Sequence, residues 1–468
     1  MTQQQEATEI GAEVVERISS STGEPSWLKS FRLNALQYYL DLPDEQSNLY
    51  SKYALDIKFD LSSASRHLPS EPSAASMHEI AEGVDSKGPY YITTRSETIA
   101  SKNVKDLETK GVIFCDFHEA LEKHTSILKR IFEKKAIRPE SDKYAALNSA
   151  LFSTAWLVYV PSGVQLEQPL RIRSYLNSKE PSFSQTWILG EPECSISLQT
   201  ESYGAPIEGF ASELVEAYVR EGANVHYSNI QNYSENTTVL ENKKAICQKD
   251  STINWALGYF GGRVTRARLE SVFQGDGASS EDVEVVFGDE SQKFDLVSDL
   301  SHVARHTKGR ILANSVLKDR STSIFKGMIR IGHEAKNANA YLAGHSILLS
   351  PEAKSDAIPG LEILTNDVKA THSASVAQID DDQIFYMMTR GLPLDEAKKF
   401  IVLGFLEPGI SRIDSEDLRD TMRDLVEAKW YGKKGLVKKH RKEVLFEEEA
   451  QDQSKSRRDI FEGHYKYR

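Results

Sequence analysis

The middle of the chain, from residue 156 to about residue 379, is built from many short segments in which apolar and polar residues alternate. Gly, Asn, Asp and Ser separate these segments at close intervals. Alternation lines one face of an extended strand with apolar side chains, and short strands divided by turn residues are typical of an all-β fold. Examples of the predicted strands are 224–228, 253–257, 268–273, 282–287, 311–316 and 324–331.

Two architectures fit this all-β region equally well. Roughly 220 residues is large for one β-sandwich, and no Asn-Gly or Asp-Gly pair joins two matched long strands as in a hairpin. The small residues at 337–341 would let the backbones of stacked coils approach closely, as in a solenoid. No repeat of fixed length is visible, so the pattern alone leaves a β-helix and a β-sandwich open.

The first region has apolar residues at three- and four-residue spacing, which predicts helices. Residues 1–155 are therefore predicted to be mainly helical, with a polar loop at 62–86. The predicted helices of this region are 10–18, 27–40, 117–134 and 143–155.

The helical pattern returns after the β region, which divides the chain into regions 1–155, 156–380 and 381–468. Gly391 follows the first helix of the last region and suits a backbone with positive φ. Pro408 is predicted to end the second helix. The predicted helices of this region are 383–389, 394–405 and 415–429.

The net charge argues against a nucleic-acid partner, and the hydropathy argues against a membrane-spanning protein. The net charge is −12, with 57 basic and 69 acidic residues, which is the reverse of a general nucleic-acid binder. A basic cluster at 433–442 is followed by acidic residues at 447–449, as is typical of a solvated helix. No segment approaches the roughly 18 apolar residues that span a membrane, and an acidic N-terminus argues against a targeting peptide. We therefore predict a cytoplasmic protein.

Neither cysteines nor histidines predict a metal site by their spacing. Cys115, Cys194 and Cys247 are too far apart for a CxxC site or a disulfide framework, so we predict buried thiols. His302 and His306 lie in a strand-like segment, where a separation of four residues is about 13 Å, too far to share one metal ion.

Catalytic signatures are also absent from the sequence. The chain contains no GxxxxGK[ST] phosphate-binding loop, no GxGxxG fingerprint, no GxSxG nucleophile motif and no HExxH zinc motif. These absences favour a scaffold over an enzyme.

Residues 367–408, DVKATHSASVAQIDDDQIFYMMTRGLPLDEAKKFIVLGFLEP, resemble the SufB/SufD family closely. Other segments match the family in the same order, among them 146–150, 325–329 and 359–363. The resemblance implies a right-handed parallel β-helix between helical N- and C-terminal regions. It also implies a non-catalytic scaffold of iron–sulfur cluster assembly that pairs with a SufB-type subunit and docks the SufC-type ABC ATPase.

The resemblance further implies which residues act. His372 matches a histidine at the SufB–SufD interface, where it would bind metal together with a SufB partner. The implied SufC-docking residues are Phe385, Tyr386, Arg390, Gly391 and Phe405. The chain has no cysteine beyond Cys247, and Ser373 follows His372 in place of glutamate, so it resembles SufD more than SufB. No cofactor is then held stably by the chain alone, and an Fe–S cluster would be present transiently at the interface.

Two other functions stay open. A β-helix polysaccharide lyase or hydrolase would require acidic and basic side chains such as Asp295, Asp299 and Arg305 to converge. A β-helix adaptor outside cluster assembly is the second. The sequence also leaves open whether the isolated chain forms a homodimer through its sheet edges.

Overall fold

The computed structural model describes residues 10–45, 48–52, 55, 57, 59, 88–94, 98–413 and 415–432. The predicted loop at 62–86 and the charged clusters at 433–442 and 447–449 lie outside the described residues.

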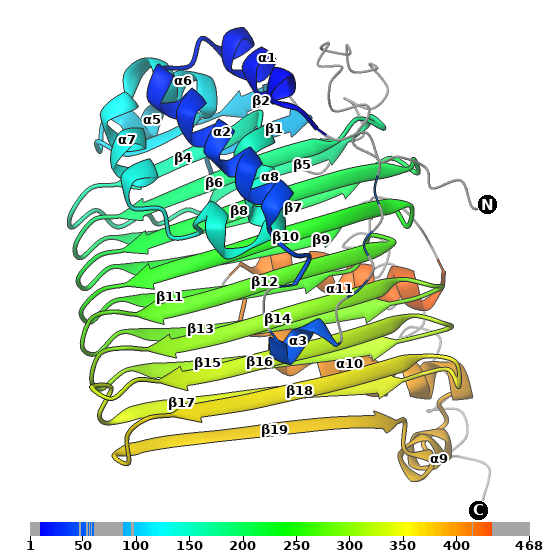
Figure 1. Cartoon of the computed structure of the whole chain (residues 1–468). Helices are drawn as coiled ribbons and strands as arrows, with labels where there is room; N and C mark the ends of the chain where they lie inside the picture. Colours follow the sequence, from blue (N-terminus) through cyan, green and yellow to red (C-terminus); the bar gives the residue numbers. More distant parts are fainter. Residues whose placement is uncertain are drawn as a thin grey trace, which may run out of the picture.

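The described chain is a parallel β-solenoid of about 8 turns, flanked by helices at both ends of the sequence (Figure 1). We call its ten-stranded sheet sheet A and its nine-stranded sheet sheet B. In spatial order, sheet A contains β2 (Thr98–Lys102), β1 (Tyr90–Thr94), β5 (Leu170–Leu176), β7 (Ser195–Gly204), β9 (Asn224–Asn232), β11 (Thr252–Tyr259), β13 (Ser279–Gly288), β15 (Lys308–Leu317), β17 (Ala338–Leu348) and β19 (Val368–Gln378). Sheet B contains β3 (Ile113–Asp116), β4 (Thr154–Val160), β6 (Ser182–Gly190), β8 (Gly209–Val219), β10 (Thr237–Cys247), β12 (Val264–Phe273), β14 (Lys293–His302), β16 (Thr322–Ile331) and β18 (Lys354–Ile363).

From β4 onwards, successive strands alternate between the two sheets, so each strand pairs in parallel with the strand two places away in the sequence. β11, for example, lies between β9 and β13 in sheet A. This pairing decides in favour of the β-helix and against the β-sandwich. Coil length varies, because Val264 pairs with Thr238 whereas Lys354 pairs with Thr322. That variation explains why no fixed repeat is visible in the sequence.

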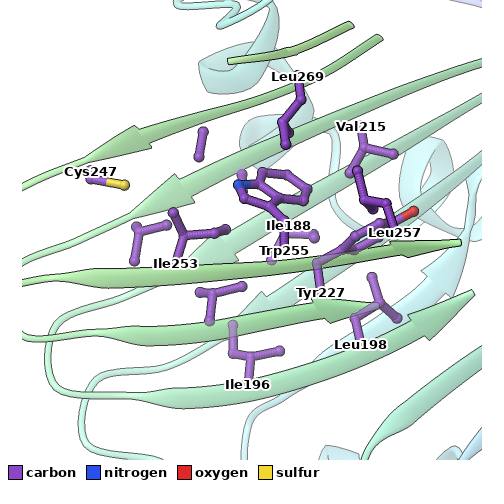
Figure 2. Close-up of a cluster of buried hydrophobic side chains, with 14 of the residues drawn as sticks. Ile188, Ile196, Leu198, Val215, Tyr227, Cys247, Ile253, Trp255, Leu257 and Leu269 are labelled. Carbon is purple, nitrogen blue, oxygen red and sulfur yellow. The ribbon is translucent and has the colours of Figure 1, made fainter. Parts of the chain in front are cut away.

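Alternate residues of each strand point between the sheets and stack in columns along the solenoid axis. In one column, Leu198, Tyr227 and Trp255 are adjacent in register and buried. Side chains of sheet B, including Leu269, meet them from the opposite side (Figure 2). The alternation seen in the sequence therefore corresponds to an interior column on each strand.

Small residues in the last coils make room for large ones on the facing sheet. Ala338 and Ala340 are buried in the interior, as the small residues at 337–341 led us to expect. A Cβ atom on Gly344 would lie 2.6 Å from Cδ1 of Phe325, which is closer than atoms can pack. Gly344 is thus needed for the fit of the phenyl ring.

Most helices of the first region cover the outer face of sheet B at its first strands, whereas Tyr50 of the short helix α3 lies against Lys326 of β16. Their bounds are α1 (Ala12–Thr22), α2 (Ser26–Asp41), α3 (Asn48–Ser51), α5 (Lys105–Glu108), α6 (Phe117–Lys123), α7 (Thr125–Glu133), the 3-10 helix η2 (Pro139–Ser141) and α8 (Lys143–Leu151). Arg32 of α2 is buried between a carboxylate, Glu24 at 2.6 Å, and the ring of Phe152, whose centre lies 3.8 Å from the guanidinium carbon. The guanidinium fastens α2 to the end of α8.

Two details of this region differ from the prediction. No pattern in the sequence predicted β1, β2 and β3, which extend the sheets at their first end. The predicted helix 117–134 is wrong as one helix, because His124 leaves the helical conformation and divides it into α6 and α7. The break lets Phe117 of α6 and Leu128 of α7 reach the same core.

Helices of the last region are α9 (Asp381–Thr389), α10 (Leu394–Ile410) and α11 (Glu416–Trp430). α10 and α11 run back along the outer face of sheet A (Figure 1). Pro408 does not end α10 as predicted but lies inside it. Leu406 and Ile410 on either side of it are buried against sheet A, and their burial outweighs the one hydrogen bond that proline removes.

The solenoid interior also contains charged groups near its middle. Lys243 of β10 forms an ion pair with Glu241 and lies 3.9 Å from Glu213 of β8. Glu284 of β13 accepts a hydrogen bond from the hydroxyl of Ser298. Burial raises the pKa values of Glu213 and Glu284 to about 7, although the Lys243 ammonium acts to lower both.

These carboxyl groups should make folding stability depend on pH. The unfolded chain releases such protons near pH 4.5 and the folded chain near pH 7. The contribution of the protonated carboxyl group to the free energy of unfolding is therefore fully present below pH 4.5 and is lost as the pH rises towards and through 7. The variant Glu284→Gln removes one titrating group. In urea unfolding, the free energy of unfolding of the variant, relative to that of wild type, should rise by about 3 kcal/mol from pH 4.5 to pH 8. The matched change Glu352→Gln, at an exposed turn, should keep the wild-type slope of unfolding free energy against pH. The same slope in Glu284→Gln would contradict the assignment of the pH dependence to Glu284.

Candidate functional site

The two ends of the solenoid differ in how far other residues of the chain cover them. At the first end, β2 pairs antiparallel with β1, and β3 pairs antiparallel with β4. The interior is covered at this end, where Tyr91, Leu107 and Phe114 are buried, whereas every residue of β18 and β19 at the last end is exposed or half-buried. β18 and β19, like β2 and β3, have strand partners on one side only within the described chain. Their outer edges therefore present backbone N–H and C=O groups that no described strand satisfies.

His372 lies on β19 at this open end. It is in register with Leu342, so it continues an interior column of sheet A past the last complete coil. Leu342 is fully buried, whereas His372 is exposed and its imidazole makes no hydrogen bond or ion pair with the described residues. Its imidazole is therefore free to bind a group supplied from outside the chain.

Apolar side chains surround the open end. Ile363, Leu364 and Val376 are each at least two-fifths exposed, although they belong to or follow the last two strands. Exposed apolar groups next to unpaired strand edges are characteristic of a surface that another chain covers.

A second apolar surface lies on α9 and the neighbouring α10. We call it the helical apolar surface, and its members are Phe385, Tyr386, Met388, Leu394 and Phe400. Phe385 is 68% exposed, whereas Ile384 beside it is the buried residue that holds α9 in place. The two helices pack against each other, so these side chains belong to one part of the molecule.

The structure separates the predicted docking residues into two groups. Arg390 lies over the ring of Tyr386, at 5.1 Å from its centre, and donates to its hydroxyl at 3.1 Å. Gly391 has the predicted positive φ, 92°, and ends α9. Phe405, however, is half-buried and packs against the core beneath α10. Arg390 thus orders the helical apolar surface, whereas Phe405 supports it from below.

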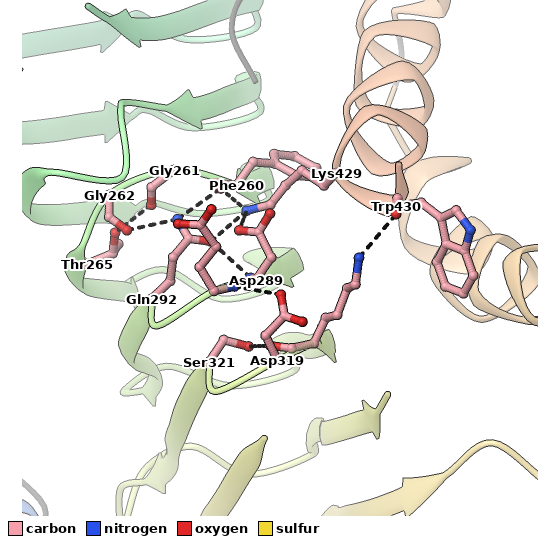
Figure 3. Close-up of polar contacts among 12 residues, drawn as sticks. Phe260, Gly261, Gly262, Thr265, Asp289, Gln292, Asp319, Ser321, Lys429 and Trp430 are labelled. Atoms are coloured by element: carbon pink, nitrogen blue, oxygen red, sulfur yellow. Dashed lines mark hydrogen bonds and ion pairs between the residues drawn. The ribbon is translucent and has the colours of Figure 1, made fainter. Parts of the chain in front are cut away.

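α11 is fastened to the solenoid by one buried lysine (Figure 3). The Lys429 ammonium lies 3.0 Å from Asp289 and donates to Gln292 at 2.6 Å and to the carbonyl of Phe260. Burial lowers its pKa, and Asp289 acts in the opposite direction. The contact joins the end of α11 to the turns that follow β11 and β13, which are distant from α11 in the sequence.

His302 and the three thiols lie away from the open end and are buried. His302 is buried against Phe273, and burial lowers its pKa to about 4. The three cysteines are buried, as predicted, and the pKa values of their thiols are raised by burial. Within the ranges that the structure describes, no group of three or more His, Cys, Asp or Glu side chains is arranged to hold a metal ion.

The side chains required for a polysaccharide-cleaving site do not converge. Asp295 is paired with Lys326 at 2.7 Å, and Asp299 is paired with Arg330 at 2.8 Å. Arg305 lies in the turn after β14, where its guanidinium pairs with Glu334 at 3.4 Å. Each charge is engaged locally, so no observation supports this alternative.

The fold and the open end define a class of protein: a β-solenoid whose last coil and C-terminal helices present surfaces to other molecules. In the described part of the chain, none of the helices has the length and apolar composition needed to cross a membrane. Residues 174–405 match the family described as "SUF system FeS cluster assembly, SufBD core domain". Residues 48–172 match the SufBD protein N-terminal region.

Curated relatives agree over most of the chain. The iron–sulfur cluster assembly protein SufB of Bacillus subtilis is 29% identical over 424 residues, which are 86% of this chain and 90% of the relative. A SufBD family protein of Staphylococcus haemolyticus is 30% identical over 424 residues, covering 86% and 89%. The chain therefore belongs to the SufBD family of iron–sulfur cluster assembly proteins.

The Lys429 contact can be tested by removing its charge. Lys429→Met leaves Asp289 without its cation and the Phe260 carbonyl without a donor, so we expect a loss of about 3 kcal/mol in unfolding free energy. Amide hydrogen exchange should increase in α11 and in the turns after β11 and β13. Lys354→Met, at an exposed position of β18, should change neither; similar behaviour of the two variants would show that the contact is unimportant.

Proposed function

We propose that this protein is a non-catalytic scaffold subunit of the SUF cluster assembly complex, acting in the cytoplasm. It pairs with a SufB-type subunit through the open end of the solenoid and docks a SufC-type ABC ATPase on its C-terminal helices. The observation that carries the proposal is the uncovered last coil: β18 and β19 are unpaired on one side and contain no buried residue, whereas the core of the first end is buried. Membership of the SufBD family supports the choice of partners.

Pairing at the open end would satisfy the unpaired backbone N–H and C=O groups of the edge strands. β19 is 11 residues long, and a long exposed edge strand invites another strand to pair with it. A partner solenoid would bring its own unpaired strands and cover Ile363 and Val376. A second copy of this chain is the alternative occupant, and measurement of the complex's composition distinguishes the two.

His372 would take part in cluster assembly at this interface. A neutral imidazole binds iron, and thiolates usually supply the remaining ligands of a cluster. The three cysteines of this chain are buried, so thiolates would come from the partner. Together with Ser373 after the histidine, this supports a SufD-like role, in which the cluster is cargo built between two chains.

The helical apolar surface supports docking of the ATPase. Five exposed apolar side chains lie on two neighbouring helices, and a contiguous exposed apolar patch of this kind is characteristic of a protein–protein interaction site. The chain has no phosphate-binding loop of its own, which is consistent with a separate subunit that supplies ATP hydrolysis. The contact of Lys429 with the solenoid would then link the docking helices to the β core.

Docking can be tested at its most exposed residue. Phe385→Ala should weaken binding of the cognate SufC-type ATPase by about 2 kcal/mol, roughly thirtyfold, because exposed aromatic anchors dominate such interfaces. The measurement is the affinity by titration calorimetry, with thermal unfolding to confirm an intact fold. Tyr38→Ala, an exposed aromatic on α2, is the control. Equal affinities for the two variants would place docking elsewhere.

The role of His372 can be tested by reconstitution with a SufB-type partner. His372→Ala should leave the pair intact on gel filtration but reduce the iron and sulfide retained after anaerobic reconstitution by at least half. His345→Ala serves as the control, because His345 bonds to Ser375 within this chain at 2.7 Å. Unchanged iron content in His372→Ala would remove this residue from the cluster site, while failure to form a pair would remove the proposed partner.

A further inference from the structure

A polar groove lies on the outer face of sheet A, whereas His372 continues a column on the inner face of the same sheet. Its volume is about 450 Å³, and strands β11, β13, β15 and β17 form its floor near their starts. The side chains that matter for its chemistry are Asn254, Glu281, Lys308, Arg310, Asn339 and Tyr341.

The parallel register places these residues in two neighbouring columns. Lys308 is adjacent to Ser279 on one side and Asn339 on the other, while Arg310 is adjacent to Glu281 and Tyr341. Paired residues of neighbouring strands lie about 4.8 Å apart, so the side chains form a continuous polar surface. α10 and α11 cover the outer face of sheet A further along the strands and leave this part open.

The groove carries positive charge on a protein whose net charge is −12. Lys308 is exposed, and its side-chain ammonium has no hydrogen-bond or ion-pair partner among the described residues. Arg310 is 46% exposed, lies over the ring of Tyr341 at 5.4 Å from its centre, and has Glu281 at 3.9 Å. Arg412, which follows α10, also pairs with Glu281. Arg310 and Arg412 thus share one carboxylate, and the Lys308 ammonium adds a further positive charge beside them.

We propose that this groove binds a small organic or inorganic dianion whose charged groups are phosphates or carboxylates. Lys308 and Arg310 lie two residues apart on the same face of β15, about 6.6 Å along the strand, and would each receive one charged group. The guanidinium can bind two oxygens side by side, and its ring contact with Tyr341 limits its movement. The amides of Asn254 and Asn339 offer further hydrogen bonds. The volume is within the range of ligand sites, about 300–1,000 Å³.

Titration calorimetry of the full chain with inorganic pyrophosphate and, separately, with citrate tests this site. We expect saturable binding of at least one probe with a stoichiometry of one per chain. Binding should weaken about tenfold in Lys308→Met, which removes one charged contact. Lys354→Met, which removes an exposed lysine from sheet B, should bind as wild type does. The preferred probe identifies the charged group as phosphate or carboxylate.

The variant Glu281→Gln provides a change in the opposite direction. Removal of the one carboxylate in the groove should tighten binding several-fold, a result that a misfolded variant cannot imitate. Absence of saturable binding for both probes would overturn the proposal. So would equal weakening in Lys308→Met and Lys354→Met, because that outcome indicates non-specific attraction to surface cations. The site is independent of cluster assembly, so its test does not depend on either proposed partner.

Discussion

Hydrogen bonding between successive coils is the constraint on which the rest of this structure depends. Each strand of a parallel solenoid has its backbone groups satisfied by the coil before and the coil after it, so only the two ends pose a problem. At the first end, the sheets finish with the short antiparallel strands β2 and β3, and Leu107 and Phe114 cover the core beside them. Nothing in the described chain closes the last end, where β18, β19 and His372 are presented. The location of the candidate site follows from this asymmetry.

The outer faces of the two sheets are used differently. Helices of the first region cover the first strands of sheet B through apolar packing and the buried Arg32. The C-terminal helices cover only part of sheet A, where Lys429 fastens α11 to the turns. They leave the cationic groove exposed at the strand starts and carry the helical apolar surface beyond the sheet. One solenoid therefore offers three separate surfaces of different chemistry.

Much of this fold could be predicted from local patterns. The six strands named from alternation lie within observed strands, because inward and outward residues of a coil face opposite environments. Gly391 has its positive φ, since local steric preference decides it. Prediction failed where distant contacts outweigh local preference: Pro408 remains inside α10 because Leu406 and Ile410 are buried against sheet A. The strands β1–β3 are short, and their stability comes from sheets assembled elsewhere in the chain.

By itself, the sequence determined the all-β middle, the helical flanks, the buried thiols and, through its resemblance, the SufBD family. It also singled out His372 and Phe385. Only the tertiary structure decided between β-helix and β-sandwich, because strand pairing depends on contacts between residues roughly 30 positions apart that no local pattern encodes. It likewise separated exposed Phe385 from half-buried Phe405, and brought Lys308, Arg310 and Tyr341 together. Burial and proximity are properties of the packed coils, and a single segment does not contain them.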